Sequence, residues 1–221
     1  MDLVYICRDG DNEELRYSIR SAVANLPHDN VWVVGGKPDW YTGNYIRIKQ
    51  NALKFDNARN NLNAICRKQE VSSDFVLMND DFFIVKPIES VEPYHRGLLE
   101  DHIDLVKTSP AYKQMLVETL DVINYVTTGA IYSYELHVPM VMNKNKLAKV
   151  LRFPALWRSL YGNMYSVGGT EHKDVKVFSG TTLEEMSSDL PFLSSNDETF
   201  SDMIGLLKEM FPNPSKYELH P

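Results

Sequence analysis

The first part of the chain alternates between short apolar runs and stretches with helical spacing. Leu3–Cys7, Val31–Val34 and Phe75–Met78 are apolar runs typical of strands buried on both faces of a sheet, and Tyr45–Ile48 is a weaker candidate. Between them, apolar residues recur at helical spacing in two sets, which are Leu15, Ile19, Ala22, Val23 and Leu26, then Ala58, Leu62, Ile65 and Cys66. This alternation predicts an α/β fold with a mostly parallel sheet covered by helices.

The ends of the two predicted helices carry start and stop signals. Asp11 is the predicted N-cap of the first, with Glu14 completing a capping box, and Pro27 closes the segment. The second helix is predicted to start at Asp56 or Asn57.

The second half of the chain has a less regular pattern. It predicts a last helix capped by Ser195, with Glu198 closing the box. The other predicted elements are helices over Leu98–Lys107, Ala111–Tyr125, Lys144–Leu151 and Pro154–Tyr161, and a late strand over Val175–Phe178. No repeat or linker marks two independently folding domains.

Composition narrows the class of protein. A net charge of −7 over 221 residues argues against general nucleic-acid binding, which needs a concentrated basic surface. Cys7 and Cys66 are the only cysteines, so we expect reduced thiols in a cytoplasmic setting and no disulfide framework or cysteine zinc site. No apolar run is long enough to span a bilayer, and the N-terminus lacks the pattern of a signal peptide.

Three loops follow the predicted strands, and in such sheets ligands bind beyond the carboxyl ends of the strands. The loops are Arg8-Asp9-Gly10, Gly35-Gly36-Lys37 and Asn79-Asp80-Asp81. Two adjacent carboxylates after a buried strand need something to offset their repulsion, and Mg²⁺ or Mn²⁺ would do so. The alternative is a solvated turn, where Asn and Asp are common. The sequence has neither a P-loop nor a G-x-G-x-x-G turn.

Several segments also resemble a known group of enzymes. E-E-L-R-Y-S-I-R-S (Glu13–Ser21), V-W-V-V-G-G-K-P-D-W (Val31–Trp40) and V-L-M-N-D-D-F-F (Val76–Phe83) are similar to blocks of bacterial and phage glycosyltransferases and of Stealth-type sugar-phosphate transferases. The later E-L-H-V-P-M-V (Glu135–Val141) and L-Y-G-N-M-Y (Leu160–Tyr165) look like the phage-type members. The resemblance covers most of the chain.

The resemblance implies a GT-A-like fold in a single domain, residues 1–221. Residues 1–90 would form the nucleotide-sugar-binding half, and residues 91–221 the acceptor side with a C-terminal helix. The implied activity is metal-dependent transfer of a sugar, with a UDP-sugar as the first choice of donor, to a hydroxyl on a glycan, a protein or a modified nucleobase. The implied location is the cytoplasm, or the host cytoplasm for a phage protein.

The resemblance also assigns roles by position. Asp81 becomes the direct ligand of Mn²⁺ or Mg²⁺, and Asp80 reaches the ribose, the sugar or a metal-bound water. Asn79 stands where the first Asp of a D-x-D motif would be. His137 is the preferred late metal ligand, with His172 as the alternative. A core histidine bonded to the backbone is the competing interpretation of His137.

Arg8, Arg59 and Asn60 are predicted to face the nucleotide sugar. Arg8 follows the first strand, and its alternative role is a loop cation paired with Asp9 or Asp11. Arg59 and Asn60 resemble an A-R-N helix start, where a helix N-terminus with an arginine suits an anion. The alternative is an exposed helical arginine.

The general base and the acceptor stay open. Candidate bases are Glu135, Glu171, Asp174 and Asp197. Trp157, Tyr161 and Tyr165 could stack on a sugar, although core packing is the favoured interpretation. Two other functions are a Stealth-type hexose-1-phosphate transferase and a non-catalytic nucleotide- or carbohydrate-binding module. The sequence does not identify the sugar, the nucleotide, the stereochemical outcome (retention or inversion) or the oligomeric state.

Overall fold

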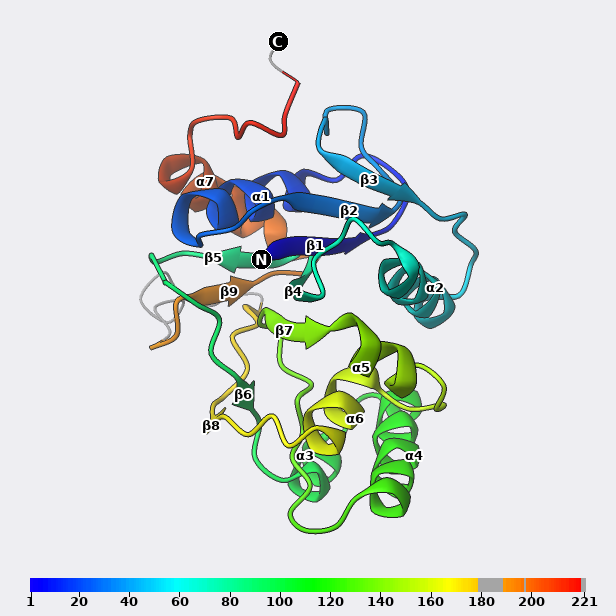
Figure 1. Ribbon diagram of the computed structural model, residues 1–221. Helices are drawn as coiled ribbons and strands as arrows, with labels where there is room; N and C mark the ends of the chain where they lie inside the picture. The colour runs from blue at the N-terminus through cyan, green and yellow to red at the C-terminus, as the bar shows by residue number, and fades with distance from the viewer. Residues whose placement is uncertain (179–188, 197, 220–221) are drawn as a thin grey trace. The chain divides into compact units, whose positions relative to one another are not determined.

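A five-stranded sheet forms the centre of the larger part of the protein (Figure 1). The computed structural model describes residues 1–178, 189–196 and 198–219. The strands are β1 (Asp2–Cys7), β2 (Val31–Gly35), β3 (Asn44–Arg47), β4 (Asp74–Asn79) and β7 (Met140–Asn143), in the order β3-β2-β1-β4-β7. Strands β3, β2, β1 and β4 run parallel to one another. The predicted α/β class with a mostly parallel sheet is therefore confirmed.

The strand order reverses beside β1. The chain goes from β1 to β2 and β3 on one side, and then returns to place β4 on the other side. In register, Val4 lies opposite Trp32 and Leu77, and Ile6 lies opposite Asn79. The carboxyl ends of β1 and β4 therefore lie together at the point of reversal, where a crevice for ligands forms in open α/β sheets.

The two helices that connect these strands begin at other residues than predicted. Helix α1 (Glu13–Asn25) is capped by Asn12, whose Oδ1 accepts the Leu15 N–H at 2.9 Å, so the predicted cap at Asp11 is wrong. Helix α2 (Lys54–Arg67) begins before Asp56 and Asn57 and has no side-chain cap. Its start carries no capping signal that a sequence could show.

A smaller layer packs beside α1. Strand β5 (Phe82–Ile84) pairs antiparallel with β9 (Phe192–Ser194), and helix α7 (Phe200–Met210) covers them. Their shared core consists of Tyr17, Phe83, Val177, Leu193, Met203, Leu207 and Phe211.

Two predictions about this layer are wrong. In place of a strand over Val175–Phe178 there is only a single bridge from Lys176 to Ser194. Ser195 does not cap the last helix, because its hydroxyl donates to Glu14 Oε1 at 2.8 Å and Thr199 holds the N-cap position.

Glu218 ties the C-terminal segment to α1. Its side chain is 1% exposed and its Oε2 lies 2.7 Å from Arg20 Nη2 and 3.1 Å from Arg16 Nη1. The Ser215 N–H donates to its Oε1 at 2.8 Å. Burial alone would raise the pKa of Glu218, but the hydrogen bonds from Arg20 and Ser215 outweigh burial and hold that pKa below its usual value.

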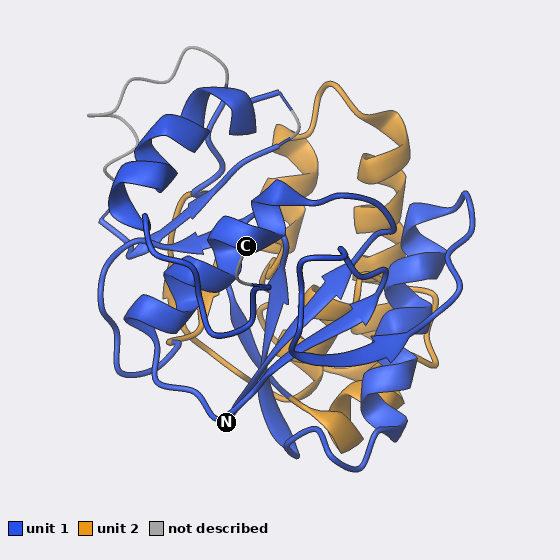
Figure 2. Ribbon diagram, turned by 90° about the horizontal axis from the view of Figure 1, so that it is seen from above, with its two compact units in different colours: residues 1–91, 137–142, 175–221 blue, residues 92–136, 143–174 orange. Residues whose placement is uncertain are grey.

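The chain forms two compact units (Figure 2). Unit 1 comprises residues 1–91, 137–142 and 175–221, and unit 2 comprises residues 92–136 and 143–174. The chain leaves unit 1 after residue 91 and returns to it twice, at residues 137 and 175.

Unit 2 is mostly helical. Its helices are α3 (Leu99–Leu105), α4 (Pro110–Val126), α5 (Lys144–Val150) and α6 (Trp157–Met164), with β6 (Tyr94–His95) paired to β8 (Thr170–Glu171). Tyr161 is 4% exposed and accepts the Asn143 N–H at 2.8 Å, which agrees with core packing for that residue. Across the described ranges of both units, no helix is long and apolar enough to cross a membrane.

Candidate functional site

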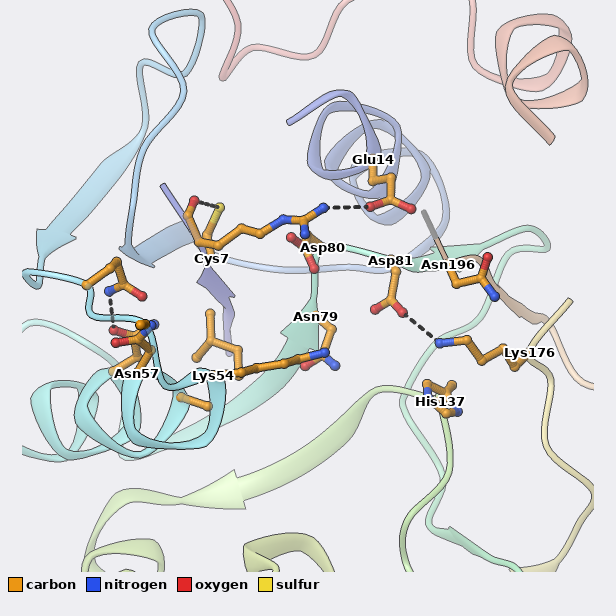
Figure 3. Close-up of a pocket in the computed structure, with 16 residues that line it drawn as sticks. Cys7, Glu14, Lys54, Asn57, Asn79, Asp80, Asp81, His137, Lys176 and Asn196 are labelled. Atoms are coloured by element: carbon orange, nitrogen blue, oxygen red, sulfur yellow. Dashed lines mark hydrogen bonds and ion pairs between the residues drawn. The ribbon is translucent and has the colours of Figure 1, made fainter. Parts of the chain in front are cut away.

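Unit 1 contains a pocket of about 460 Å³ at the carboxyl ends of β1 and β4 (Figure 3). All the residues that line it belong to unit 1. They are Ile6, Cys7, Arg8, Glu14, Gln50, Ala52, Lys54, Asn57, Ala58, Asn61, Asn79, Asp80, Asp81, His137, Lys176 and Asn196. The position is the one that the strand order predicts for a ligand site.

Asp80 is held by the residue that caps α1. Asn12 Nδ2 donates to Asp80 Oδ2 at 2.6 Å, while Asn12 Oδ1 accepts the Leu15 N–H. Burial, and then the charge of Asp81, raise the pKa of Asp80 above its usual value. One asparagine therefore links the start of α1 to a pocket carboxylate whose pKa is raised.

Asp81 has different partners. Its Oδ2 lies 3.7 Å from Lys176 Nζ and accepts a hydrogen bond from Ser194 Oγ at 3.2 Å. Its backbone oxygen accepts the Ser195 N–H at 3.2 Å. Lys176 and Ser194 therefore offset part of the repulsion between the two adjacent carboxylates.

Cys7 lines the pocket as a thiol. Burial, and then the nearby Asp80 charge, raise the pKa of Cys7 to about 12. A nucleophilic cysteine needs a lowered pKa, so this residue is not suited to nucleophilic attack.

Arg8 lies on the exposed rim. Its side chain is 63% exposed and its Nη2 lies 4.0 Å from Glu14 Oε2. An ion pair of this length with an exposed arginine contributes little to stability. Asp9 is also exposed but does not line the pocket.

Helix α2 presents a different face from the one predicted. Lys54, Asn57, Ala58 and Asn61 line the pocket, whereas Arg59 and Asn60 do not. These four positions repeat at the spacing of a single helix face. That spacing is the signal that could have identified them, once the helix is known to begin at Lys54.

Gly35 and Gly36 are buried and do not line the pocket. A Cβ on Gly35 would lie 2.3 Å from the Cys7 carbonyl oxygen, and one on Gly36 would lie 2.3 Å from that of Arg8. Gly35 also has a φ of +110°, which side chains rarely adopt. Both glycines allow the chain after β2 to pass directly against the end of β1, behind the residues that face the pocket.

The two predicted histidines fall in different units. His137 lines the pocket, with its ring edge-on to Phe82 at 6.3 Å between centroids. His172 belongs to unit 2, where its Nδ1 lies 2.8 Å from the Lys173 carbonyl oxygen.

The candidate general bases Glu135, Glu171 and Asp174 belong to unit 2. Glu135 Oε1 accepts both the backbone N–H and the hydroxyl of Ser159, at 3.1 and 2.9 Å. Asp174 pairs with Arg96 at 3.2 Å, and Glu171 is exposed beside Gly97. Asp197 lies outside the described residues.

The donor set suits a cation shared with a ligand. Asn79, Asp80 and Asp81 bring oxygen atoms to one pocket, the ligand type that Mg²⁺ and Mn²⁺ prefer. Within residues 1–178, 189–196 and 198–219, no group of three or more His, Cys, Asp or Glu side chains could hold a metal by itself. One or two carboxylates completed by substrate phosphates is the usual Mg²⁺ arrangement, so these residues fit such a metal.

Two residues that hold the pocket carboxylates Asp80 and Asp81 were not singled out in the sequence. Lys176 comes from the late segment and Asn12 from the loop before α1. Asn12 sits three residues before Leu15, a spacing that also fits an N-cap. Lys176 carries no comparable local signal, because its partner Asp81 is distant in sequence.

Comparison with known proteins adds no assignment. No family model matches the chain, and no curated protein matches its sequence.

Proposed function

We propose that this protein is a glycosyltransferase of the GT-A type, which transfers a sugar from a nucleoside diphosphate sugar to a hydroxyl acceptor with the help of a divalent cation. The observation that carries the proposal is the pocket at the strand reversal, where Asp80 and Asp81 share one cavity with cationic side chains. Carboxylates and cations together suit a metal-bound diphosphate.

The roles of the residues follow from their charges and positions. Asp81 and Asn79 would hold Mg²⁺ or Mn²⁺, with Asp80 reaching the ribose, the sugar or a metal-bound water. When bound, the cation neutralises charge that develops on the leaving nucleoside diphosphate. Arg8 and Lys54 add positive charge for phosphate oxygens from the rim. Proton transfer from the acceptor requires a base, for which Glu135, Glu171 and Asp174 stay candidates.

A panel of nucleotide sugars incubated with MnCl₂ tests the proposal, with release of the nucleoside diphosphate as the readout. We expect turnover of at least one donor, with UDP-sugars first. Asp81→Asn should reduce turnover by at least about 100-fold, as removal of one group that stabilises transition-state charge usually does. The matched control is Asp202→Asn, an exposed carboxylate on α7 that is not part of the pocket.

Two results would contradict the proposal. If no nucleotide sugar binds or reacts in the presence of Mn²⁺, the pocket serves another ligand. Tight binding without turnover would favour the non-catalytic binding module.

A hexose-1-phosphate transferase is the second candidate, and the cationic side chains of the pocket favour it. Among the described residues, Arg8, Lys54 and Lys176 all line this pocket, a set that suits more than one phosphate group. The mass of the product separates the two reactions. A phosphotransferase adds a phosphate along with the sugar and releases a nucleoside monophosphate.

A further inference from the structure

The ion pair between Lys176 and Asp81 occupies the carboxylate that a metal would need. Lys176 Nζ lies 3.7 Å from Asp81 Oδ2, and the two side chains are 20% and 17% exposed. Ser194 Oγ donates to the same oxygen at 3.2 Å. Figure 3 shows Lys176 reaching across the pocket toward Asp81. The Lys176 ammonium group is therefore partly shielded from water but still open to the pocket.

Strand β9 holds both ends of this pair. Lys176 forms a parallel bridge with Ser194, and the Val177 N–H donates to the Ser194 carbonyl oxygen at 2.8 Å. Ser194 lies opposite Phe82, the residue that follows Asp81 in the chain. The Ser195 N–H donates to the Asp81 carbonyl oxygen. The backbones that carry the two side chains are thus joined through β9 by backbone pairing.

An ammonium group and a divalent cation compete for the same carboxylate. A lysine ammonium is a compact charge on a flexible four-carbon stem. A divalent cation bound to Asp81 would repel it and take over its partner. Because Lys176 lines the pocket, its displaced ammonium would stay within reach of a ligand there.

We propose that Lys176 is an internal counter-ion of Asp81 that a divalent cation displaces, and that the released ammonium then binds a phosphate of the ligand. The inference rests on the proposed metal and diphosphate site and adds a positioning residue to it. Binding of the metal and binding of the phosphate ligand would then be coupled, each strengthening the other by the same factor.

Lys54 provides a matched comparison. It also lines the pocket and is exposed, but within the described part of the chain it has no ion pair with Asp81. Loss of the Lys54 charge should change the electrostatic potential of the pocket without removing the ion pair of Asp81.

The test is calorimetric titration of MnCl₂ into the free protein and its variants, without a sugar donor. Lys176→Met should bind Mn²⁺ about fivefold more tightly than the wild type, the size expected when a partly exposed ion pair no longer competes. Lys54→Met should stay within about twofold, and Lys176→Arg should resemble the wild type because it keeps the charge. Thermal melting of each variant checks that it is folded.

A second titration uses UDP as the probe, with and without MnCl₂. Mn²⁺ should strengthen UDP binding more in the wild type than in Lys176→Met, because only the wild type releases an ammonium to the phosphate. The inference is overturned if Lys176→Met binds Mn²⁺ no more tightly than the wild type, if Lys54→Met tightens binding equally, or if no protein binds Mn²⁺.

These outcomes are separate from the fate of the proposed function. Turnover of a nucleotide sugar with unchanged Mn²⁺ affinity in Lys176→Met would contradict only the counter-ion role of Lys176. Tighter Mn²⁺ binding in that variant, with no turnover by the wild type, would contradict only the proposed glycosyltransferase activity.

Discussion

Unit 1 holds carboxylates in two contrasting ways, in the pocket and at the C-terminal segment. Glu218 is 1% exposed and is bound by Arg20 and Arg16, which are 11% and 21% exposed. Asp81 is 17% exposed with one lysine at 3.7 Å, and the arginine on the pocket rim is 63% exposed. The pKa of Glu218 is lowered, whereas that of Asp80 is raised.

The contrast separates a carboxylate that stabilises the fold from carboxylates that we propose bind a ligand. At Glu218 the protein has provided enough donors to outweigh burial. At Asp80 it has not, so the ionised form is held at a cost that a bound cation could offset. Perturbed carboxylates of the second kind cluster at functional sites.

The largest effect is expected at Glu218. Glu218→Gln should lower the free energy of unfolding by about 3 kcal/mol, because it removes the buried negative charge that pairs with Arg20 and Arg16, which are 11% and 21% exposed. Urea denaturation at neutral pH measures the loss. Glu209→Gln, on the exposed side of α7, is the control and should stay within about 0.5 kcal/mol. A loss at Glu218 no larger than that of the control would remove the distinction between the two regions.

The contribution of Glu218 to the free energy of unfolding should decrease in acid. Because its pKa in the folded state lies below the ordinary value of 4.5, its stabilisation is complete above pH 4.5 and is lost as the pH falls through the lowered pKa. The difference in stability between wild type and Glu218→Gln should therefore be constant at neutral pH and shrink in acid. A difference that grows toward low pH would contradict the assignment.

Asp80 should behave in the opposite way. Its raised pKa means that its favourable contribution is present below the ordinary value of 3.8 and is lost as the pH rises through the folded-state pKa. In chelator, Asp80→Asn should raise the free energy of unfolding at neutral pH by about 1 kcal/mol, as relief of a destabilised site commonly does. The new amide oxygen can still accept the hydrogen bond from Asn12. The gain should disappear in acid, and a loss of stability at neutral pH would show that Asp80 supports the fold.

The smallest change in stability is expected at the pocket rim. Arg8→Gln should alter the free energy of unfolding by about 0.5 kcal/mol or less, because Arg8 is 63% exposed and lies 4.0 Å from Glu14. The same variant should weaken binding of UDP in the presence of Mn²⁺, measured by calorimetry. Unchanged UDP affinity would place Arg8 among ordinary surface cations.

The central strands were predictable because strands buried in a parallel sheet are continuously apolar. Leu3–Cys7 and Val31–Val34 match β1 and β2 to within a residue. Helix starts were less predictable. Asn12 caps α1 although Asp11 is equally suitable by type, and α2 starts without any capping side chain.

The acidic end of β4 and its neighbour Arg8 were predictable, since the carboxyl ends of adjacent parallel strands meet. Lys176 was not, because its contact with Asp81 depends on how β9 pairs with β5. Arg59 and Asn60 were assigned by resemblance to an A-R-N helix start. The side of α2 that lines the pocket carries Lys54 and Asn57 instead, because residues three and four apart share a helix face.

The bond between α1 and Glu218 also sets an order of events during synthesis. Arg20 and Glu218 are separated by 198 residues, so this bond cannot form until residue 218 has left the ribosome. All the residues of unit 2 are made earlier, between positions 92 and 174. Unit 2 can therefore fold while unit 1 waits for its last segment, with β5 and α1 still uncovered by β9 and α7.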